Sequence, residues 1–335
     1  MTDDACHALR MVSEYSTRNA AFHVRHLHAF RVDVGFGAEF VRLLYTAASC
    51  WQHERQLCVM RPQRVSAWML HAGWHDYFEL IFPEQALGFV GRWNTSEPSR
   101  WRRGVIRHAI NSFVRHSADA FSTAADVLPS INENFRFLVT HEDVGYWDSM
   151  QHLSEVLWTF NSRTRASVDS ARHALFADDA ACGVHIRRGD KRSEYDYMPL
   201  ESYCQCIRQV VRSSAEVVLI ASDDRRAAQE LSLLIAPFCT PIVLSDGEGY
   251  HQATFNRDQN ASSRKQHMTR LFAEIELLRR CKNFVGTSTS NVFLLVGSLR
   301  AGKRCIDLTD SGWLPLNSMS EPSFSESDKV ATSCS

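Results

Sequence analysis

Short apolar runs alternate with longer stretches of helical periodicity through the second half of the chain. The runs are three to five residues long and contain many β-branched side chains, which is typical of buried strands. Between them, apolar residues recur every three or four positions, which predicts amphipathic helices. The predicted strands are 183–186, 217–221, 242–244, 283–286 and 305–308, and the predicted helices are 199–210, a helix from 225 onward, 269–280 and 292–299.

The first half of the chain shows the same alternation less completely. Residues 28–34 alternate as a strand, residues 40–49 form an apolar helix and residues 55–59 predict a second strand. Strand–helix alternation in both halves predicts an α/β protein with two Rossmann-like domains that face a cleft. We expect an N-terminal acceptor-side domain over 1–165, a C-terminal nucleotide-binding domain over 166–317 and a disordered, Ser-rich tail over 318–335.

The charge balance and the cysteine spacing argue against several classes of protein. The chain of 335 residues has a net charge of −1, whereas nucleic-acid binders normally carry a basic excess. No apolar run approaches the roughly 20 residues of a membrane span, and the polar start has no signal-peptide core. The ten cysteines form no zinc-type pairs, and we interpret His23, His26 and His28 as packing or surface residues.

A dense group of charged residues follows the predicted strand 183–186. Arg187 and Arg188 carry planar guanidinium groups, which suit paired phosphate oxygens. Asp190 is the expected orienter of one arginine, and His185, two residues before Arg187, shares its face of the strand. The alternative is a surface ion-pair network, because charge clusters are usually solvated.

Two further stretches are candidate anion sites. Gly35, Phe36 and Gly37 stand between a predicted strand and a helix, an arrangement in which backbone amides cradle phosphate. The alternative is a tight turn that merely needs glycine. Residues 287–291, Thr-Ser-Thr-Ser-Asn, open the predicted helix 292–299, where hydroxyls and amides can hold a diphosphate or simply cap the helix.

Two adjacent acids, Asp223 and Asp224, follow the predicted strand 217–221. They are candidates for ligand binding at the strand end. Capping of the next helix is the common alternative, and Mg²⁺ binding by the pair is a less favoured one.

Two acids on the predicted helix 269–280 are expected to face different ways. Glu274 lies three or four residues from Leu271 and Leu278 of the apolar stripe, so we predict that it points inward. Glu276 has arginines three and four residues further on, the arrangement of a surface ion pair.

The string that begins at His185 resembles the donor-binding motif of the α-1,6-fucosyltransferases, glycosyltransferase family 23. The family pattern is His-x-Arg-Arg-x-Asp-Lys at a strand end, then a Glu and a Pro-led helix carrying a Tyr. The resemblance covers about 28–80 and 144–308. It departs at Gly189, which replaces a larger residue, and at Glu274, where the family has an Asp. The matching residues are His185, Arg187, Arg188, Asp190, Lys191, Glu194, Pro199 and Tyr203.

The resemblance implies a GT-B fold and a role for each candidate residue. Arg187 would neutralise charge on the β-phosphate of the donor, with Arg188 and Lys191 in support and Asp190 holding them. Glu194 would be the base for the acceptor hydroxyl, relayed through Lys191. The other implied donor-site residues are Gly35, Phe36, Gly37, Ser290 and Asn291 for the diphosphate, His185 and Glu274 for guanine, and Asp223 and Asp224.

The implied reaction is inverting, metal-independent transfer of L-fucose from GDP-fucose to a glycan hydroxyl. The acceptor expected from the family is GlcNAc, fucosylated at its 6-hydroxyl, in an N-glycan core or a chitin-like oligosaccharide. Two alternatives are a protein O-fucosyltransferase and a non-catalytic protein that binds a GDP-sugar or a glycan. The family works in the Golgi lumen, and no metal cofactor is expected. The sequence leaves the acceptor and the oligomeric state open.

Overall fold

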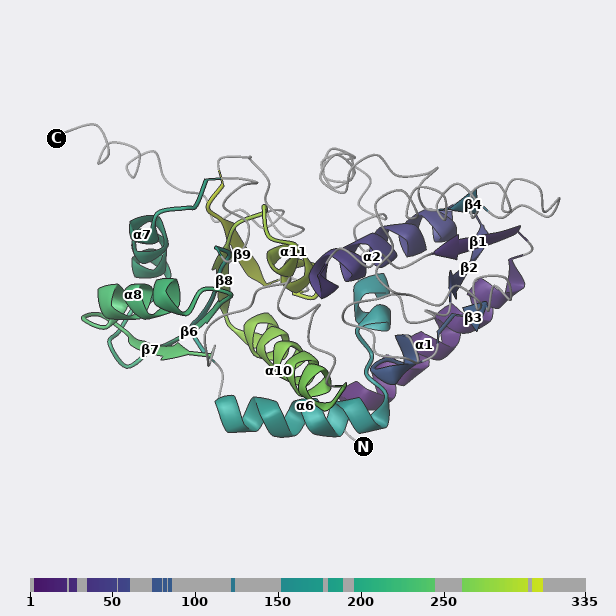
Figure 1. The fold of residues 1–335 in the computed structure, drawn as a ribbon, viewed down its shortest axis with the longest axis horizontal. Helices are drawn as coiled ribbons and strands as arrows, with labels where there is room; N and C mark the ends of the chain where they lie inside the picture. The colour runs from purple at the N-terminus through teal and green to yellow at the C-terminus, as the bar shows by residue number, and fades with distance from the viewer. Residues whose placement is uncertain are drawn as a thin grey trace.

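The computed structural model shows two separate parallel sheets with helices packed against them (Figure 1). The structure describes residues 3–22, 24–28, 35–52, 54–60, 74–79, 81–82, 84–85, 122–123, 152–176, 180–188, 196–244, 261–300 and 303–309.

The first sheet has the strand order β3-β2-β1-β4, and its neighbouring strands are all parallel. Its strands are β1 (Val24–His28), β2 (Arg55–Met60), β3 (Glu84–Gln85) and β4 (Ser122–Thr123). Helix α1 (Asp3–Ala21) precedes the sheet, and α2 (Phe36–Gln52) connects β1 to β2. The strand that we predicted at 28–34 thus includes only His28 of β1, and residues 29–34 lie outside the described residues.

The second sheet has the order β7-β6-β5-β8-β9 and is also parallel throughout. All five strands predicted in this half are confirmed within one or two residues. They are β5 (Cys182–Ile186), β6 (Val217–Ser222), β7 (Thr240–Val243), β8 (Asn283–Gly286) and β9 (Arg304–Asp307). The helices of this half are α6 (Ser162–Leu175), α7 (Leu200–Val210), α8 (Arg225–Ile235), α10 (Ala261–Arg280) and α11 (Asn291–Ser298).

Alternate residues of the central strands face opposite layers of helices, as the period of two along a strand requires. Val218 and Ile220 of β6 pack in the cluster that contains α7 and α8. Leu219 and Ala221 of the same strand pack in the cluster that contains α10 and α11. Helices therefore cover both faces of the second sheet (Figure 1), which explains why its strands appear in the sequence as continuous apolar runs.

The connections of the second sheet place its strand-order reversal between β5 and β8. The chain goes from β5 to β6 and β7 on one side, and α10 then carries it back to β8 on the other side of β5. Open α/β sheets bind ligands in the crevice outside the carboxyl ends of the strands at such a reversal. The fold therefore predicts a ligand site at the carboxyl ends of β5 and β8.

One apolar core joins the two sheets. Leu57 of β2 and Phe284 of β8 belong to the same buried cluster. At its centre, Phe272 of α10 packs on Phe36 at 5.0 Å and on Phe78 at 5.4 Å between ring centroids. The expected domain boundary at 165 falls inside α6, a helix that packs against α10.

Within the part of the chain that the structure describes, no helix has the length and apolar character needed to cross a membrane.

Candidate functional site

Arg187 and Asp223 form an ion pair just beyond the carboxyl ends of β5 and β6. The register pairs Ile186 with Ser222, so the next residue of each strand comes opposite the other. One oxygen of Asp223 accepts from the Arg187 guanidinium, and the other accepts from the backbone N–H of Arg188 at 2.8 Å. The two side chains are only 15% and 7% exposed. Asp223 therefore orients Arg187, the role that the sequence suggested for Asp190.

Asp224, in contrast, caps α8. Its side chain accepts from the backbone N–H groups of Arg226 at 2.9 Å and Ala227 at 3.3 Å. This is the capping role that we named as the alternative for the acidic pair. Direct contact of Asp223 or Asp224 with a donor stays a prediction.

His185 is the fourth residue of β5, and its side chain lies beside the loop that follows β8. The residue is 6% exposed, and its Nδ1 lies 3.3 Å from the hydroxyl oxygen of Ser290. Burial, with a smaller contribution from the Arg187 charge, lowers the pKa of His185 to about 3. The ring is therefore neutral at physiological pH, and its Nε2 has no hydrogen-bond partner among the described residues.

The loop between β8 and α11 is held by Asp307 at the end of β9. One carboxylate oxygen of Asp307 accepts from the backbone N–H of Ser288 at 2.9 Å and from the Thr309 hydroxyl at 2.7 Å. Ser290 then caps α11 by accepting from the backbone N–H of Phe293 at 3.5 Å. The hydroxyls of this loop thus serve the loop and the helix cap, with Ser290 also reaching His185.

The N-termini of α2 and α11 meet beside this loop (Figure 1). A Cβ atom added at Gly37 would lie 3.2 Å from the Asn291 carbonyl carbon and the Val292 nitrogen. Gly37 thus permits a close approach of two backbones, and it belongs to the first turn of α2, not to a turn before the helix. The Phe36 side chain is buried among aromatic rings, so only its backbone can serve a ligand. Two helix N-termini, each carrying partial positive charge, therefore meet close to His185 and Ser290.

Arg188 holds the segment that leads into α7. Its guanidinium lies 5.6 Å from the Tyr197 ring centroid and donates to the Met198 carbonyl at 3.4 Å. The Tyr197 hydroxyl donates in turn to the Arg188 carbonyl at 2.6 Å. The residues on either side of 189–195 are therefore fastened together, and a direct role of Arg188 toward phosphate stays a prediction.

The prediction that Glu276 forms a surface ion pair was wrong about the surface. Glu276 is completely buried, whereas the Glu274 side chain is 15% exposed and pairs with Arg270 at 3.2 Å. Glu276 accepts from the Trp158 indole N–H at 2.6 Å and pairs with Arg279 at 3.1 Å. Burial alone would raise the pKa of Glu276, but Arg279 and the Trp158 hydrogen bond hold that pKa below its usual value. The predicted pairing with the following arginines is confirmed, but it is a buried one.

Three candidates, Asp190, Lys191 and Glu194, lie outside the described residues. Among the residues that are described, no group of three His, Cys, Asp or Glu side chains could hold a metal ion. Metal-independent chemistry stays a prediction.

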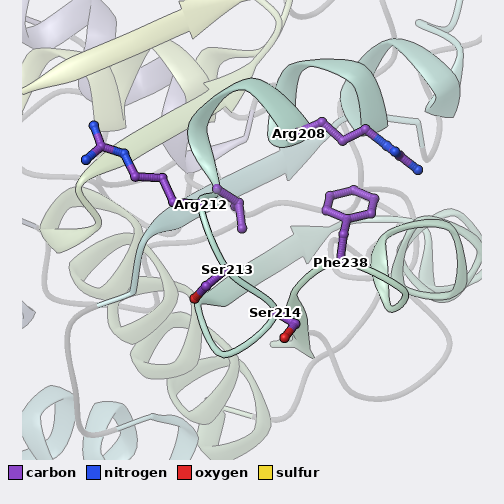
Figure 2. A pocket seen from close by; sticks show the side chains of 6 residues that line it. Arg208, Arg212, Ser213, Ser214 and Phe238 are labelled. Atoms are coloured by element: carbon purple, nitrogen blue, oxygen red, sulfur yellow. The ribbon is translucent and has the colours of Figure 1, made fainter.

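A hollow of about 450 Å³ lies at the other end of the second sheet from Arg187 and Asp223 (Figure 2). Arg208 extends over the Phe238 ring at 4.4 Å, and Arg212, Ser213 and Ser214 follow along the loop before β6. These residues lie at the amino ends of β6 and β7, away from the crevice where α/β sheets bind ligands. We assign no site to this hollow.

Comparison with known proteins supports the fold. No protein-family model matches the chain, and no curated protein sequence gives a significant match. The fucosyltransferase NodZ from Bradyrhizobium aligns with a TM-score of 0.50 and 16% identity, over 87% of this chain and 97% of NodZ. This chain has the GT-B fold.

Two other solved structures align at lower scores. An Arabidopsis thaliana FUT1 variant in complex with GDP has a TM-score of 0.49 and 13% identity, over 91% of this chain and 79% of its own. POFUT1 in complex with GDP-fucose has a TM-score of 0.46 and 11% identity, over 85% and 98%.

Proposed function

We propose that this protein transfers L-fucose from GDP-fucose to a glycan hydroxyl with inversion and without a metal. The observation that carries the proposal is the Arg187–Asp223 pair at the carboxyl edge of the second sheet, next to the β5–β8 reversal. The sequence motif from His185 to Tyr203 and the GT-B fold shared with NodZ support the same reading.

Arg187 is the residue that we assign to the leaving group. When the bond between fucose C1 and the phosphate oxygen breaks, its electron pair stays on the β-phosphate. A guanidinium held in place can stabilise that charge without reorganising during the reaction. Asp223 supplies this preorganisation through its contact with Arg187, while its second oxygen is taken by the Arg188 backbone.

The diphosphate pocket that we propose lies at the N-termini of α2 and α11. We propose that backbone N–H groups at Phe36, Gly37 and Asn291 face the diphosphate, because the amides in the first turn of a helix have no intrahelical acceptor. We propose that His185 and Glu274 contact the guanine. Glu274 already forms an ion pair with Arg270. A bound guanine would therefore either share the Glu274 carboxylate with Arg270 or displace Arg270 from it.

For the acceptor, we propose the 6-hydroxyl of GlcNAc in an N-glycan core or a chitin-like oligosaccharide. Glu194 would take the hydroxyl proton, with Lys191 as relay. We further propose that 1–165 forms the acceptor side and 166–317 the donor side, and that the protein works in the Golgi lumen. These finer assignments rest on the family resemblance.

The decisive experiment is calorimetric titration of GDP and GDP-fucose in metal-free buffer. We expect both to bind the wild type and to bind Arg187→Ala much more weakly. An acceptor screen with N-glycans, chitin oligosaccharides and protein acceptors then identifies the acceptor. No binding of GDP to the wild type would show that the arginine motif is a structural ion network, and the proposal would fall.

A further inference from the structure

Ser290 and His185 form a buried polar pair whose hydrogen positions can be deduced. Ser290 is 2% exposed and His185 is 6% exposed. The Ser290 hydroxyl has two partners among the described residues, the backbone N–H of Phe293 and the Nδ1 atom of His185. The Phe293 N–H can only donate, so it occupies one lone pair of the hydroxyl oxygen.

The remaining question is which atom of the pair carries the proton. If His185 were protonated on Nδ1, it would donate to Ser290, and the buried Ser290 O–H would have no acceptor. If Nδ1 is unprotonated, the Ser290 O–H donates to it at 3.3 Å, and both the hydroxyl and Nδ1 are paired, while Nε2 has no partner among the described residues in either tautomer. Buried polar groups without a partner are costly, so the second arrangement is favoured. The proton of the neutral ring then resides on Nε2.

We propose that Ser290 is a positioning residue that holds His185 in the tautomer protonated on Nε2. The ring near the β5–β8 reversal then carries an N–H donor on Nε2, which suits a hydrogen-bond acceptor on the ligand. Resting on the proposed function, this acceptor is an oxygen or ring nitrogen of a 6-oxopurine. An amino group at the same place would oppose one donor with another. Ser290 would thus contribute to base selection by fixing the tautomer of His185.

The tautomer can be measured without any ligand. In a ¹⁵N-labelled protein, nitrogen–proton correlation spectra distinguish the protonated ring nitrogen from the unprotonated one. His185→Gln identifies the His185 signals among those of the 15 histidines. We expect the Nε2-protonated form in the wild type. In Ser290→Gly we expect the tautomer ratio to fall about fivefold, the effect of losing one ordinary hydrogen bond.

The choice of variants separates the tautomer from the helix cap. Glycine at an N-cap costs only a few tenths of a kcal/mol relative to serine, so Ser290→Gly removes the hydroxyl and largely spares α11. Ser290→Thr restores a hydroxyl and should restore the wild-type ratio. Ser298→Ala removes another buried hydroxyl, at the far end of the same helix, and should leave the ratio unchanged. A wild type protonated on Nδ1, or a ratio unaltered in Ser290→Gly, would overturn the proposal.

Nucleotide titration then tests the consequence for binding. Ser290→Gly should weaken the binding of GDP and of inosine diphosphate equally, by about fivefold, because both are 6-oxopurines with the same oxygen and ring-nitrogen acceptors. Ser290→Thr should recover the affinity for both. If the wild type binds neither nucleotide, the proposed function fails while the tautomer result stands. If both bind and Ser290→Gly binds them as tightly as the wild type, the positioning role fails alone.

Discussion

The carboxyl ends and the amino ends of the strands in the second sheet, called here its carboxyl edge and its amino edge, differ in how their polar groups are held. At the carboxyl edge, Arg187, Asp223 and His185 are largely buried and each has a defined partner. At the amino edge, Arg212, Ser213 and Ser214 line a hollow but are exposed to solvent (Figure 2). Burying charged and polar groups costs free energy unless they are paired, whereas an exposed hollow costs little. Buried, paired polar groups at a strand-order reversal therefore indicate a ligand-binding site better than an exposed hollow does.

The largest expected effect separates these two edges directly. Arg187→Lys should reduce fucosyl transfer by about 10³-fold, because a lysine cannot reproduce the planar fork that we propose for the leaving phosphate. Arg208→Ala, at the amino edge, should change kcat/KM by less than about twofold. Steady-state assays with the acceptor found by the screen measure both. Substantial activity in Arg187→Lys would remove this residue from the mechanism, and a large loss in Arg208→Ala would make the hollow a functional surface.

A second comparison concerns the two acids of α10. Glu276→Ala should lower the free energy of unfolding by about 3 kcal/mol, because it leaves Trp158 and Arg279 without their buried acceptor. Glu274→Gln should leave stability nearly unchanged and weaken GDP binding. Denaturant unfolding measures the stability of both variants, and GDP titration measures their affinity. If Glu276→Ala lost GDP affinity and kept its stability, Glu276 would replace Glu274 as the proposed guanine contact.

His185 predicts a dependence of stability on pH. Its pKa is about 3 in the folded protein, below the roughly 6.5 of an unfolded histidine. Stabilisation from the neutral ring is therefore complete above pH 6.5 and is lost as the pH falls toward 3. The loss amounts to at most about 5 kcal/mol, from about 1.4 kcal/mol per pKa unit. The difference in unfolding free energy between wild type and His185→Gln, measured from pH 7.5 to 4, isolates this group. A difference independent of pH would show that the ring is solvated.

The sequence was most informative where apolar runs are short and bounded. All five strands of the second sheet were predicted because buried parallel strands are nearly continuous apolar segments. Strand β1 reads Val-Arg-His-Leu-His, without an apolar run, and was placed several residues too late.

Within the site, local sequence patterns identified candidate residues but did not identify the partners that those residues contact. The pairing of Arg187 with Asp223 follows from strand register, which spacing along the chain does not reveal. The burial of Glu276 depends on Trp158, which is 118 residues away in the sequence. Arg300 illustrates the same limit. It is almost completely buried and donates to the carbonyls of Leu278 and Cys281 at the C-terminus of α10, and no pattern in the sequence marks it.

The smallest expected effect is that of metal removal, which tests the acidic pair at the carboxyl edge. A Mg²⁺ ion at Asp223 and Asp224 would need carboxylate oxygens that point into the crevice. Both Asp223 oxygens already accept from Arg187 and Arg188, and one Asp224 oxygen caps α8. Dialysis against EDTA should therefore leave kcat unchanged within about twofold, with Mg²⁺ and Mn²⁺ add-back as the control. Strong inhibition that either ion reverses would mean that the acidic pair releases its present partners to bind a metal, and the metal would replace Arg187 as the proposed counter-charge of the leaving phosphate.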